Sequence, residues 1–263
     1  MLKDVLFRLP EPHRAQDASS AADSFALLKD RSIVDAYAKY WDAHPAFDAE
    51  NVFEIGLWDG GSIALWHEIL QPTTHVGVDI ADRRTPYFDA YAAAPERQGR
   101  IHAYWDVDQS DKARLSAIAE RHFDDPLDLV LDDGSHLYQS TKAALETLFP
   151  LLRPGGLYII EDWAWGHWGN EFRLHASPER AALTRLVAEL AGVVGSRQDV
   201  LASLDVRRHF VVLERGPGRF DGELDLGALH VWRRRGLRDS QAIWLSRRYL
   251  DAAYRRLGRR RSA

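Results

Sequence analysis

Residues 52–62 read VFEIGLWDGGS and join an apolar run to a glycine-rich turn and the start of a helix-like segment. Glycines let a backbone turn tightly and approach a ligand closely, and the free N–H groups at a helix start favour anionic groups. The next apolar run, HVGVD, ends at Asp79, 19 residues after Gly60. An acidic residue about 20 positions after such a turn binds the ribose diol in dinucleotide folds. These strings predict a site for an adenosine-containing cofactor, although Trp58 stands where those folds have a second glycine.

Strand-like and helix-like segments alternate on both sides of this turn. We expect strands over residues 52–55, 75–79, 100–104, 128–131, 157–160, 206–214 and 228–233. Helices are expected over residues 18–43, 63–70, 144–152 and 178–191. Such alternation is typical of βαβ units. The expected fold class is therefore α/β, with a mostly parallel seven-stranded sheet and helices on both faces.

Charge divides the chain unevenly. The net charge is −5, but residues 233–263 carry +9 and residues 1–232 carry −14. We expect an N-terminal helical segment over residues 1–48, a cofactor-binding domain over residues 49–235 and a basic helical extension over residues 236–263. The extension could contact an anionic partner, a second subunit or only solvent.

Composition excludes several classes of protein. There is no cysteine, which excludes disulfide scaffolds, thiolate metal sites and cysteine nucleophiles. No apolar run approaches the ~20 residues that span a bilayer, and the first residues lack the apolar core of a signal peptide. We therefore expect a cytoplasmic protein without a membrane span.

Acidic residues follow two further apolar runs. The string DDGSH ends at His136 and includes Asp133, and Glu161 and Asp162 close the run YIIED. Because adjacent parallel strands end at one edge of a sheet, we expect these three carboxylates to lie together. They would repel one another unless a cation neutralises them or some hold protons. Oxygen ligands suit Mg²⁺, and less well Mn²⁺ or Ca²⁺. Taken singly, each acid could equally well cap the helix that follows.

The strings EIGxxxGGS, VD, DQSD, DDGSH and PGGxYxxED occur here in order, over roughly residues 50–165. In this combination the chain resembles the class I methyltransferases that use S-adenosylmethionine (SAM). It resembles in particular the metal-dependent sugar O-methyltransferases of the macrocin and mycinamicin type, a group also described as cephalosporin hydroxylase-like. The resemblance implies a Rossmann-like class I methyltransferase fold, with SAM and Mg²⁺ as cofactors.

The resemblance also implies roles for individual residues. The implied cofactor-binding residues are Glu54, Gly56, Gly60, Gly61 and Ser62 for the methionine part, Asp79 for the ribose, Asp108 and Gln109 beside the adenine, and Asp132. The metal would be held by Asp133, Glu161 and Asp162, with His136 as general base. Val107 departs from the pattern, since the family usually has glycine before Asp-Gln-Ser-Asp.

The chemistry of a methyl transfer fits these residue types. A sugar hydroxyl is a poor nucleophile, and a divalent cation can orient it and lower its pKa. Histidine can accept the proton near neutral pH. We expect a SAM- and Mg²⁺-dependent O-methyltransferase that forms a homo-oligomer and acts on a sugar hydroxyl of a glycosylated natural product or of an oligo- or polysaccharide. The tryptophan-rich residues 163–168 could form an aromatic wall for the acceptor, or pack in a core or a dimer contact.

Two other functions fit the sequence less well. A ferrous oxygenase site favours two histidines and one carboxylate, and only His136 lies in the acidic cluster. A non-catalytic SAM-binding or oligomerising module would leave the acidic residues and His136 without a role. The negative charge of residues 1–232 also argues against a nucleic-acid partner.

Overall fold

The computed structural model describes residues 5–9, 20–168, 182–220, 222 and 224–229. The chain divides into two compact units, residues 1–224 and residues 225–263. In the second unit the described residues include one short helix, α8 (Leu226–Leu229). All other elements lie in the first unit. The basic extension expected over residues 236–263 lies outside the described residues.

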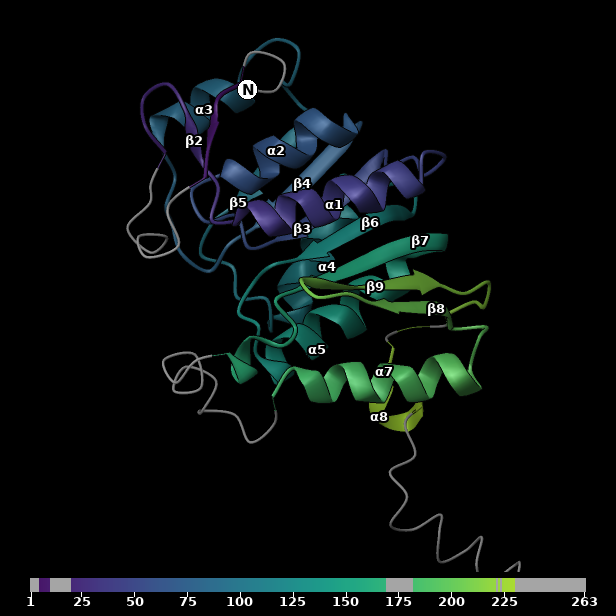
Figure 1. Ribbon diagram of the computed structural model, residues 1–263. Helices are drawn as coiled ribbons and strands as arrows, with labels where there is room; N and C mark the ends of the chain where they lie inside the picture. Colours follow the sequence, from purple (N-terminus) through teal and green to yellow (C-terminus); the bar gives the residue numbers. More distant parts are fainter. Residues whose placement is uncertain (1–4, 10–19, 169–181, 221, 223, 230–263) are drawn as a thin grey trace, which may run out of the picture. The chain divides into compact units, whose positions relative to one another are not determined.

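The described part of the first unit is built on a seven-stranded sheet with the order β5-β4-β3-β6-β7-β9-β8 (Figure 1). The strands from β5 to β7 run parallel, and β9 runs antiparallel to both of its neighbours, β7 and β8. The bounds are β3 (Asn51–Ile55), β4 (Thr74–Val78), β5 (Ile101–Tyr104), β6 (Leu127–Asp132), β7 (Leu152–Glu161), β8 (Leu201–Val206) and β9 (Phe210–Arg215). The expected α/β fold with a mostly parallel sheet is confirmed.

Helices cover both faces of this sheet. In Figure 1, α1, α2 and α3 lie on one face, and α4, α5 and α7 lie on the other. The bounds are α1 (Arg31–Ala43), α2 (Gly61–Leu70), α3 (Pro86–Ala92), α4 (Lys112–His122), α5 (Tyr138–Leu148) and α7 (Thr184–Ser196). Strand β6 is buried along its whole length, as expected of a parallel strand covered on both faces. No described helix is long and apolar enough to cross a membrane.

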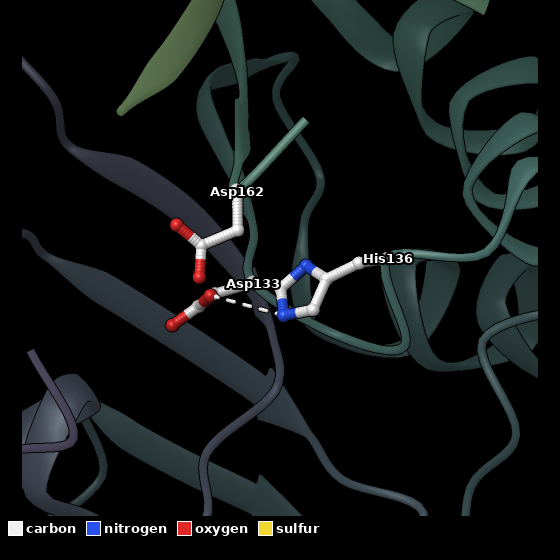
Figure 2. A group of neighbouring side chains, drawn as sticks. All are labelled: Asp133, His136 and Asp162. Atoms are coloured by element: carbon white, nitrogen blue, oxygen red, sulfur yellow. Dashed lines mark ion pairs between the residues drawn. The ribbon is translucent and has the colours of Figure 1, made fainter. Parts of the chain in front are cut away.

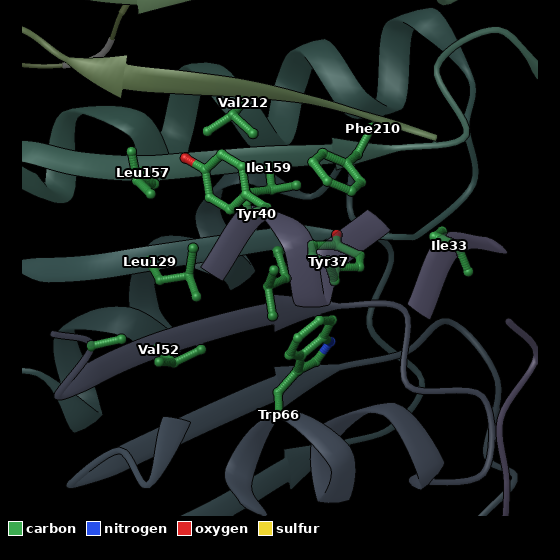
Figure 3. Close-up of a cluster of buried hydrophobic side chains, with 12 residues drawn as sticks. Ile33, Tyr37, Tyr40, Val52, Trp66, Leu129, Leu157, Ile159, Phe210 and Val212 are labelled. Atoms are coloured by element: carbon green, nitrogen blue, oxygen red, sulfur yellow. The ribbon is translucent and has the colours of Figure 1, made fainter. Parts of the chain in front are cut away.

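The core that fixes α1 lies between this helix and the sheet (Figure 3). Tyr37 stacks on Phe210 of β9 with 4.3 Å between ring centroids, and meets Trp66 of α2 edge-on at 4.6 Å. Ile33 and Tyr40, four residues before and three after Tyr37, also face this core. The helix therefore has one position on the sheet, and this position brings the residues just before it to the carboxyl ends of the strands.

The N-terminal segment is less helical than its sequence predicts. Only α1 is helical within residues 20–43, and Phe25–Ala26 (β2) pairs in parallel with Phe7–Arg8 (β1). The reason is a side-chain contact: Phe25 is fully buried and its ring lies 4.6 Å from that of Tyr87 and 5.2 Å from that of Tyr91. Tertiary packing thus overrides the local helical pattern.

The last two strands also differ from the prediction. The run expected as one strand, residues 206–214, holds a hairpin turn, because β8 ends at Val206 and β9 begins at Phe210. The polar residues 207–209 make this turn, where the N–H of Arg207 donates to the carbonyl of Phe210. Of the strand expected over residues 228–233, the first two residues belong to α8 and the rest lie outside the described residues. The expected helix over residues 178–191 begins later, as α7, and residues 178–181 are not described.

Candidate active site

A cavity of about 610 Å³ opens at the carboxyl ends of the parallel strands. Its walls come from the loops that follow β3, β4, β5, β6 and β7, together with residues 26–29 before α1. This is the edge at which open α/β sheets bind ligands. The predicted site residues that line the cavity are Gly56, Ser62, Asp79, Asp108, Gln109, Asp133, His136 and Asp162.

The glycine-rich turn after β3 makes very close backbone contacts. Gly56 has φ +90°, and a Cβ there would lie 2.2 Å from the carbonyl oxygen of Asp133. Only glycine therefore lets the loops after β3 and β6 touch at this point. Gly60 and Gly61 do not line the cavity. Added Cβ atoms there would meet the ring of Phe88 at 2.3 Å and the carbonyl oxygen of Ala26 at 2.1 Å.

Asp79 holds the same turn from the end of β4. Its Oδ2 accepts the N–H groups of Leu57 and Trp58 at 2.9 and 2.8 Å, and its Oδ1 accepts the N–H of Ala81 at 2.9 Å. Trp58 has φ +55°, and the guanidinium of Arg83 lies 4.0 Å over its ring. Trp58 and Arg83 also line the cavity, a pair that sequence reasoning missed. Asp79 therefore shapes the turn as well as facing the predicted cofactor position.

Asp132 lies beneath the cavity and supports Gln109. Its Oδ1 accepts the amide of Gln109 at 3.3 Å, and its Oδ2 accepts the hydroxyl of Tyr158 at 2.8 Å. Gln109 in turn accepts the N–H of Ser135 at 2.6 Å. Burial raises the pKa of Asp132 to about 6. Asp132 is thus placed to position Gln109, which itself lines the cavity.

Glu54 is buried in β3 and does not line the cavity. Its Oε2 lies 3.2 Å from Nε2 of His75 in β4, and both side chains are almost completely buried. Burial raises the pKa of Glu54 to about 8 and lowers the pKa of His75 to about 3. Both shifts favour the neutral forms. The two residues thus form a buried polar pair below the glycine-rich turn.

The acidic residues after β6 and β7 come together, as the sequence predicts. These strands are neighbours, with Asp132 in register with Ile160, so that Asp133, Glu161 and Asp162 follow at the same edge. Figure 2 shows Asp133, His136 and Asp162 converging. One potential ligand atom from each lies within 4.8 Å of the others, and Nε2 of His136 is 3.8 Å from Oδ1 of Asp133. His136 and Asp162 both have positive φ angles, which suggests local strain that the surroundings maintain.

A lysine that sequence reasoning missed lies among these acids. Nζ of Lys29 is 2.8 Å from Oδ2 of Asp133 and 2.8 and 2.7 Å from the two carboxylate oxygens of Glu161. The hydroxyl of Tyr37 donates to Glu161 as well, at 2.9 Å. Burial lowers the pKa of Lys29, but the negative charges of Asp133 and Glu161 outweigh burial and raise it overall. No local sequence pattern predicts these contacts, because they join residues more than 100 positions apart.

Crowding of negative charge makes this edge receptive to a cation. Burial raises the pKa of Glu161, and the nearby charge of Asp133 adds to this effect. Burial and the charge of Asp133 likewise raise the pKa of Asp162 to about 6. A divalent cation would relieve this repulsion. The donor set of carboxylates and one imidazole fits Mg²⁺ or Mn²⁺, with Asp133, His136 and Asp162 facing the cavity and Glu161 behind them, held by Lys29.

Trp165 links the two loops that carry the acidic residues. Its indole N–H donates to the carbonyl of His136 at 2.7 Å, and its backbone N–H donates to the carbonyl of Asp162 at 2.9 Å. Trp165 and Trp168 line the cavity, as an aromatic wall would. The indole of Trp163 instead donates to the carbonyl of Arg207, and His167 contacts the hydroxyl of Thr184.

Comparisons with known proteins agree with this geometry. Residues 53–163 match a family described as a methyltransferase domain. Demethylmacrocin O-methyltransferase from Streptomyces fradiae is 32% identical over 190 residues, which cover 69% of this chain and 42% of that protein. The 8-demethyl-8-alpha-L-rhamnosyl tetracenomycin-C 2'-O-methyltransferase from Streptomyces olivaceus is 38% identical over 127 residues, which cover 46% of this chain and 30% of that protein.

A solved structure shares the fold. It is the MycE methyltransferase from the mycinamycin biosynthetic pathway in complex with Mg, SAH and mycinamycin VI. The two chains are 28% identical with a TM-score of 0.52, over 73% of this chain and 51% of that one. The chain thus spans about half of this structure and less than half the length of the two curated relatives.

Proposed function

This chain carries a class I methyltransferase domain resembling the macrocin and mycinamicin sugar O-methyltransferases, and we propose that it transfers a methyl group from SAM to a sugar hydroxyl with the help of Mg²⁺. The main support is the convergence of Asp133, His136 and Asp162 on a cavity whose other wall is the glycine-rich turn after β3. A methyl donor and a metal-bound acceptor would meet in such a cavity.

The loops after β3, β4 and β5 would hold SAM. Gly56, Ser62 and the rigid turn held by Asp79 would face its methionine and ribose parts, and Asp108 and Gln109 would lie beside the adenine. Glu54, Gly60, Gly61 and Asp132 would act from behind this surface, because none of them lines the cavity. We therefore assign them support of the cofactor site rather than direct contact.

Asp133 and Asp162 would hold the cation, with Glu161 behind them as the third carboxylate. When bound, Mg²⁺ would supply positive charge that orients the acceptor hydroxyl and lowers its pKa. His136 would accept the hydroxyl proton, since its ring lines the cavity next to Asp133. Trp165 would keep His136 in place through the hydrogen bond to its carbonyl.

The proposed acceptor is a glycosylated natural product, with an oligo- or polysaccharide end as the wider class. The named relatives methylate glycosylated molecules, and MycE is described with mycinamycin VI. In this chain Trp165, Trp168 and Leu28 give the cavity an apolar side on which a sugar face or an aglycone could pack. Neither nucleic acid nor membrane is needed as a partner. Cytoplasmic location, homo-oligomer formation, the domain bounds at residues 48 and 235 and the role of the basic extension stay predictions.

Calorimetry with SAM, followed by a screen of glycosylated acceptors, tests this function. We expect SAM binding and a mass gain of one methyl group, lost on chelation with EDTA and restored by Mg²⁺. Absence of SAM binding would contradict the proposal outright. An oxygenase would instead need a ferrous site with two histidines, and the candidate metal group in the described part of the chain has one.

A further inference from the structure

Lys29 reaches the acidic residues from outside the parallel sheet. It lies between β2 and α1, and the packing of Tyr37 against Phe210 and Trp66 fixes the start of that helix. The side chain of Lys29 is 3% exposed. Its ammonium group is therefore a fixed part of the site rather than a surface charge that solvent screens.

The partners of Lys29 are two of the three carboxylates proposed to hold the cation. The ammonium contacts both oxygens of Glu161 and Oδ2 of Asp133, while Oδ1 of Asp133 faces His136. Each carboxylate thus has a fixed orientation without any metal. The lysine charge also acts on Asp162, where it lowers the pKa in opposition to burial.

The charges balance in a particular way. Three ionised carboxylates and one ammonium leave two negative charges, which one divalent cation offsets. Without the lysine, three negative charges would face the cation, and its attraction to the site would rise. A positive charge buried this close to the proposed ligands must also repel the cation directly.

We propose that Lys29 is a positioning residue that serves as a built-in cation of the metal site. It holds Asp133 and Glu161 in place before the metal arrives, but the repulsion between its charge and the cation outweighs this ordering and limits how tightly the metal then binds. This inference rests on the proposed function, because it assumes that Asp133, Glu161 and Asp162 receive a divalent cation. It assigns to the segment before α1 a role in setting metal affinity.

The experiment measures Mn²⁺ binding by electron paramagnetic resonance in the full chain at neutral pH. Lys29→Met removes the charge, and Lys29→Gln removes it while keeping a hydrogen-bond donor beside Glu161, which protects folding. We expect both variants to bind Mn²⁺ at least about tenfold more tightly than the original chain. The matched control is Lys112→Met, which breaks an ion pair with Glu146 outside the cavity and should leave Mn²⁺ binding unchanged.

A second readout is thermal unfolding with and without Mn²⁺. Without metal, the Lys29 variants should unfold at a lower temperature, because Glu161 is left buried without its counter-ion. Mn²⁺ should raise their unfolding temperature by more than it raises that of the original chain. Equal or weaker Mn²⁺ binding by the Lys29 variants would overturn the role of Lys29. Failure of the original chain to bind Mn²⁺ would instead contradict the proposed function itself.

Discussion

The acidic residues on the two sides of the cavity have different hydrogen-bond partners. On the cofactor side, formed by the loops after β3, β4 and β5 together with Asp132 at the end of β6, the carboxylate of Asp79 accepts three backbone N–H groups. The carboxylate of Asp132 accepts hydrogen bonds from the hydroxyl of Tyr158 and the amide of Gln109. On the acidic side, the loops after β6 and β7, Asp133 and Glu161 share a single ammonium group. The first set is satisfied mainly by neutral donors, with the guanidinium of Arg83 3.5 Å from Oδ1 of Asp79, and the second keeps an excess of negative charge.

This difference distinguishes acidic residues that stabilise the loops of the site from acidic residues that would bind a cation. A carboxylate saturated by backbone donors stabilises a loop and has little capacity for a cation. Carboxylates that crowd around one lysine keep an excess of negative charge, and a divalent cation would offset this charge. Both sets follow apolar strands in the sequence, so their partners rather than their positions distinguish them.

The largest expected effect tests the catalytic role of His136 on the acidic side. Loss of a general base lowers turnover by about 10²–10⁴-fold. We therefore expect His136→Ala to lose this much methyl transfer, measured with an acceptor found by the screen, while SAM binding persists. His167→Ala is the control, because His167 contacts Thr184 and does not line the cavity.

Mn²⁺ affinity then decides between two roles for His136. If His136 is a base, His136→Ala should keep most of its Mn²⁺ affinity, whereas a metal ligand would lose it. Turnover close to that of the original chain would remove His136 from the mechanism altogether.

A second prediction concerns Gly56, where the two sides touch. Gly56→Ala adds a methyl group 2.2 Å from the carbonyl oxygen of Asp133 at a φ of +90°. We expect a loss of about 3 kcal/mol or more in the free energy of unfolding, measured in urea, because backbone strain and a steric clash combine. Binding of both SAM and Mn²⁺ should weaken.

Gly99→Ala separates strain from clash. Gly99 has φ +79° with open space around the added Cβ, so only the strain of about 1–2 kcal/mol is expected. Equal effects of the two substitutions would show that the contact between the loops is unimportant.

The smallest expected effect is the pH dependence contributed by Glu54 and His75. The raised pKa of Glu54, about 8 against an ordinary 4.5, means that the folded state holds a proton that the unfolded state has lost. This lowers the free energy of unfolding as pH rises from about 4.5 to 8. The lowered pKa of His75, about 3 against 6.5, acts in the opposite direction between about pH 3 and 6.5. The two effects oppose each other below about pH 6.5, so only the decline from Glu54 remains above it.

Glu54→Gln should therefore make the decline in unfolding free energy between about pH 6.5 and 8 less steep, measured by urea unfolding at several pH values, while the raised pKa of Glu161 maintains the rest of it. Glu50→Gln, at an exposed position just before β3, is the control. SAM affinity should change little, because Glu54 does not line the cavity. A large loss of SAM affinity would instead favour the direct cofactor role that the sequence implies.

Local patterns were enough to predict the sheet and the acids at its edge. The apolar runs before Gly56, Asp79, Asp133 and Asp162 are short and bounded, and the parallel order of their strands brings these residues to one cavity. The positions of the last two strands could not be predicted in the same way. Residues 206–214 read as one strand despite the polar residues 207–209, and only the pairing between β8 and β9 reveals the turn within them.

The contacts of the site residues with Lys29 and Tyr37 could not be predicted from the sequence for a similar reason. Lys29 meets Glu161 across 132 positions, and Tyr37 meets it across 124. Such contacts follow from the docking of α1 on the sheet, which depends on the whole core. The sequence also does not reveal that Asp132 points beneath the cavity while its neighbour Asp133 lines it, because this depends on where the strand ends.

These two adjacent aspartates allow the most direct test of the central claim, that the acidic side binds a divalent cation and the cofactor side does not. The measurement is Mn²⁺ binding by Asp133→Asn and Asp132→Asn, with the original chain as reference. We predict that Asp133→Asn binds Mn²⁺ at least about tenfold more weakly, because it removes a charged ligand. Asp132→Asn should bind it as the original chain does, since the amide oxygen can still accept the hydroxyl of Tyr158. Equal loss in both variants, or no loss in Asp133→Asn, would contradict this assignment.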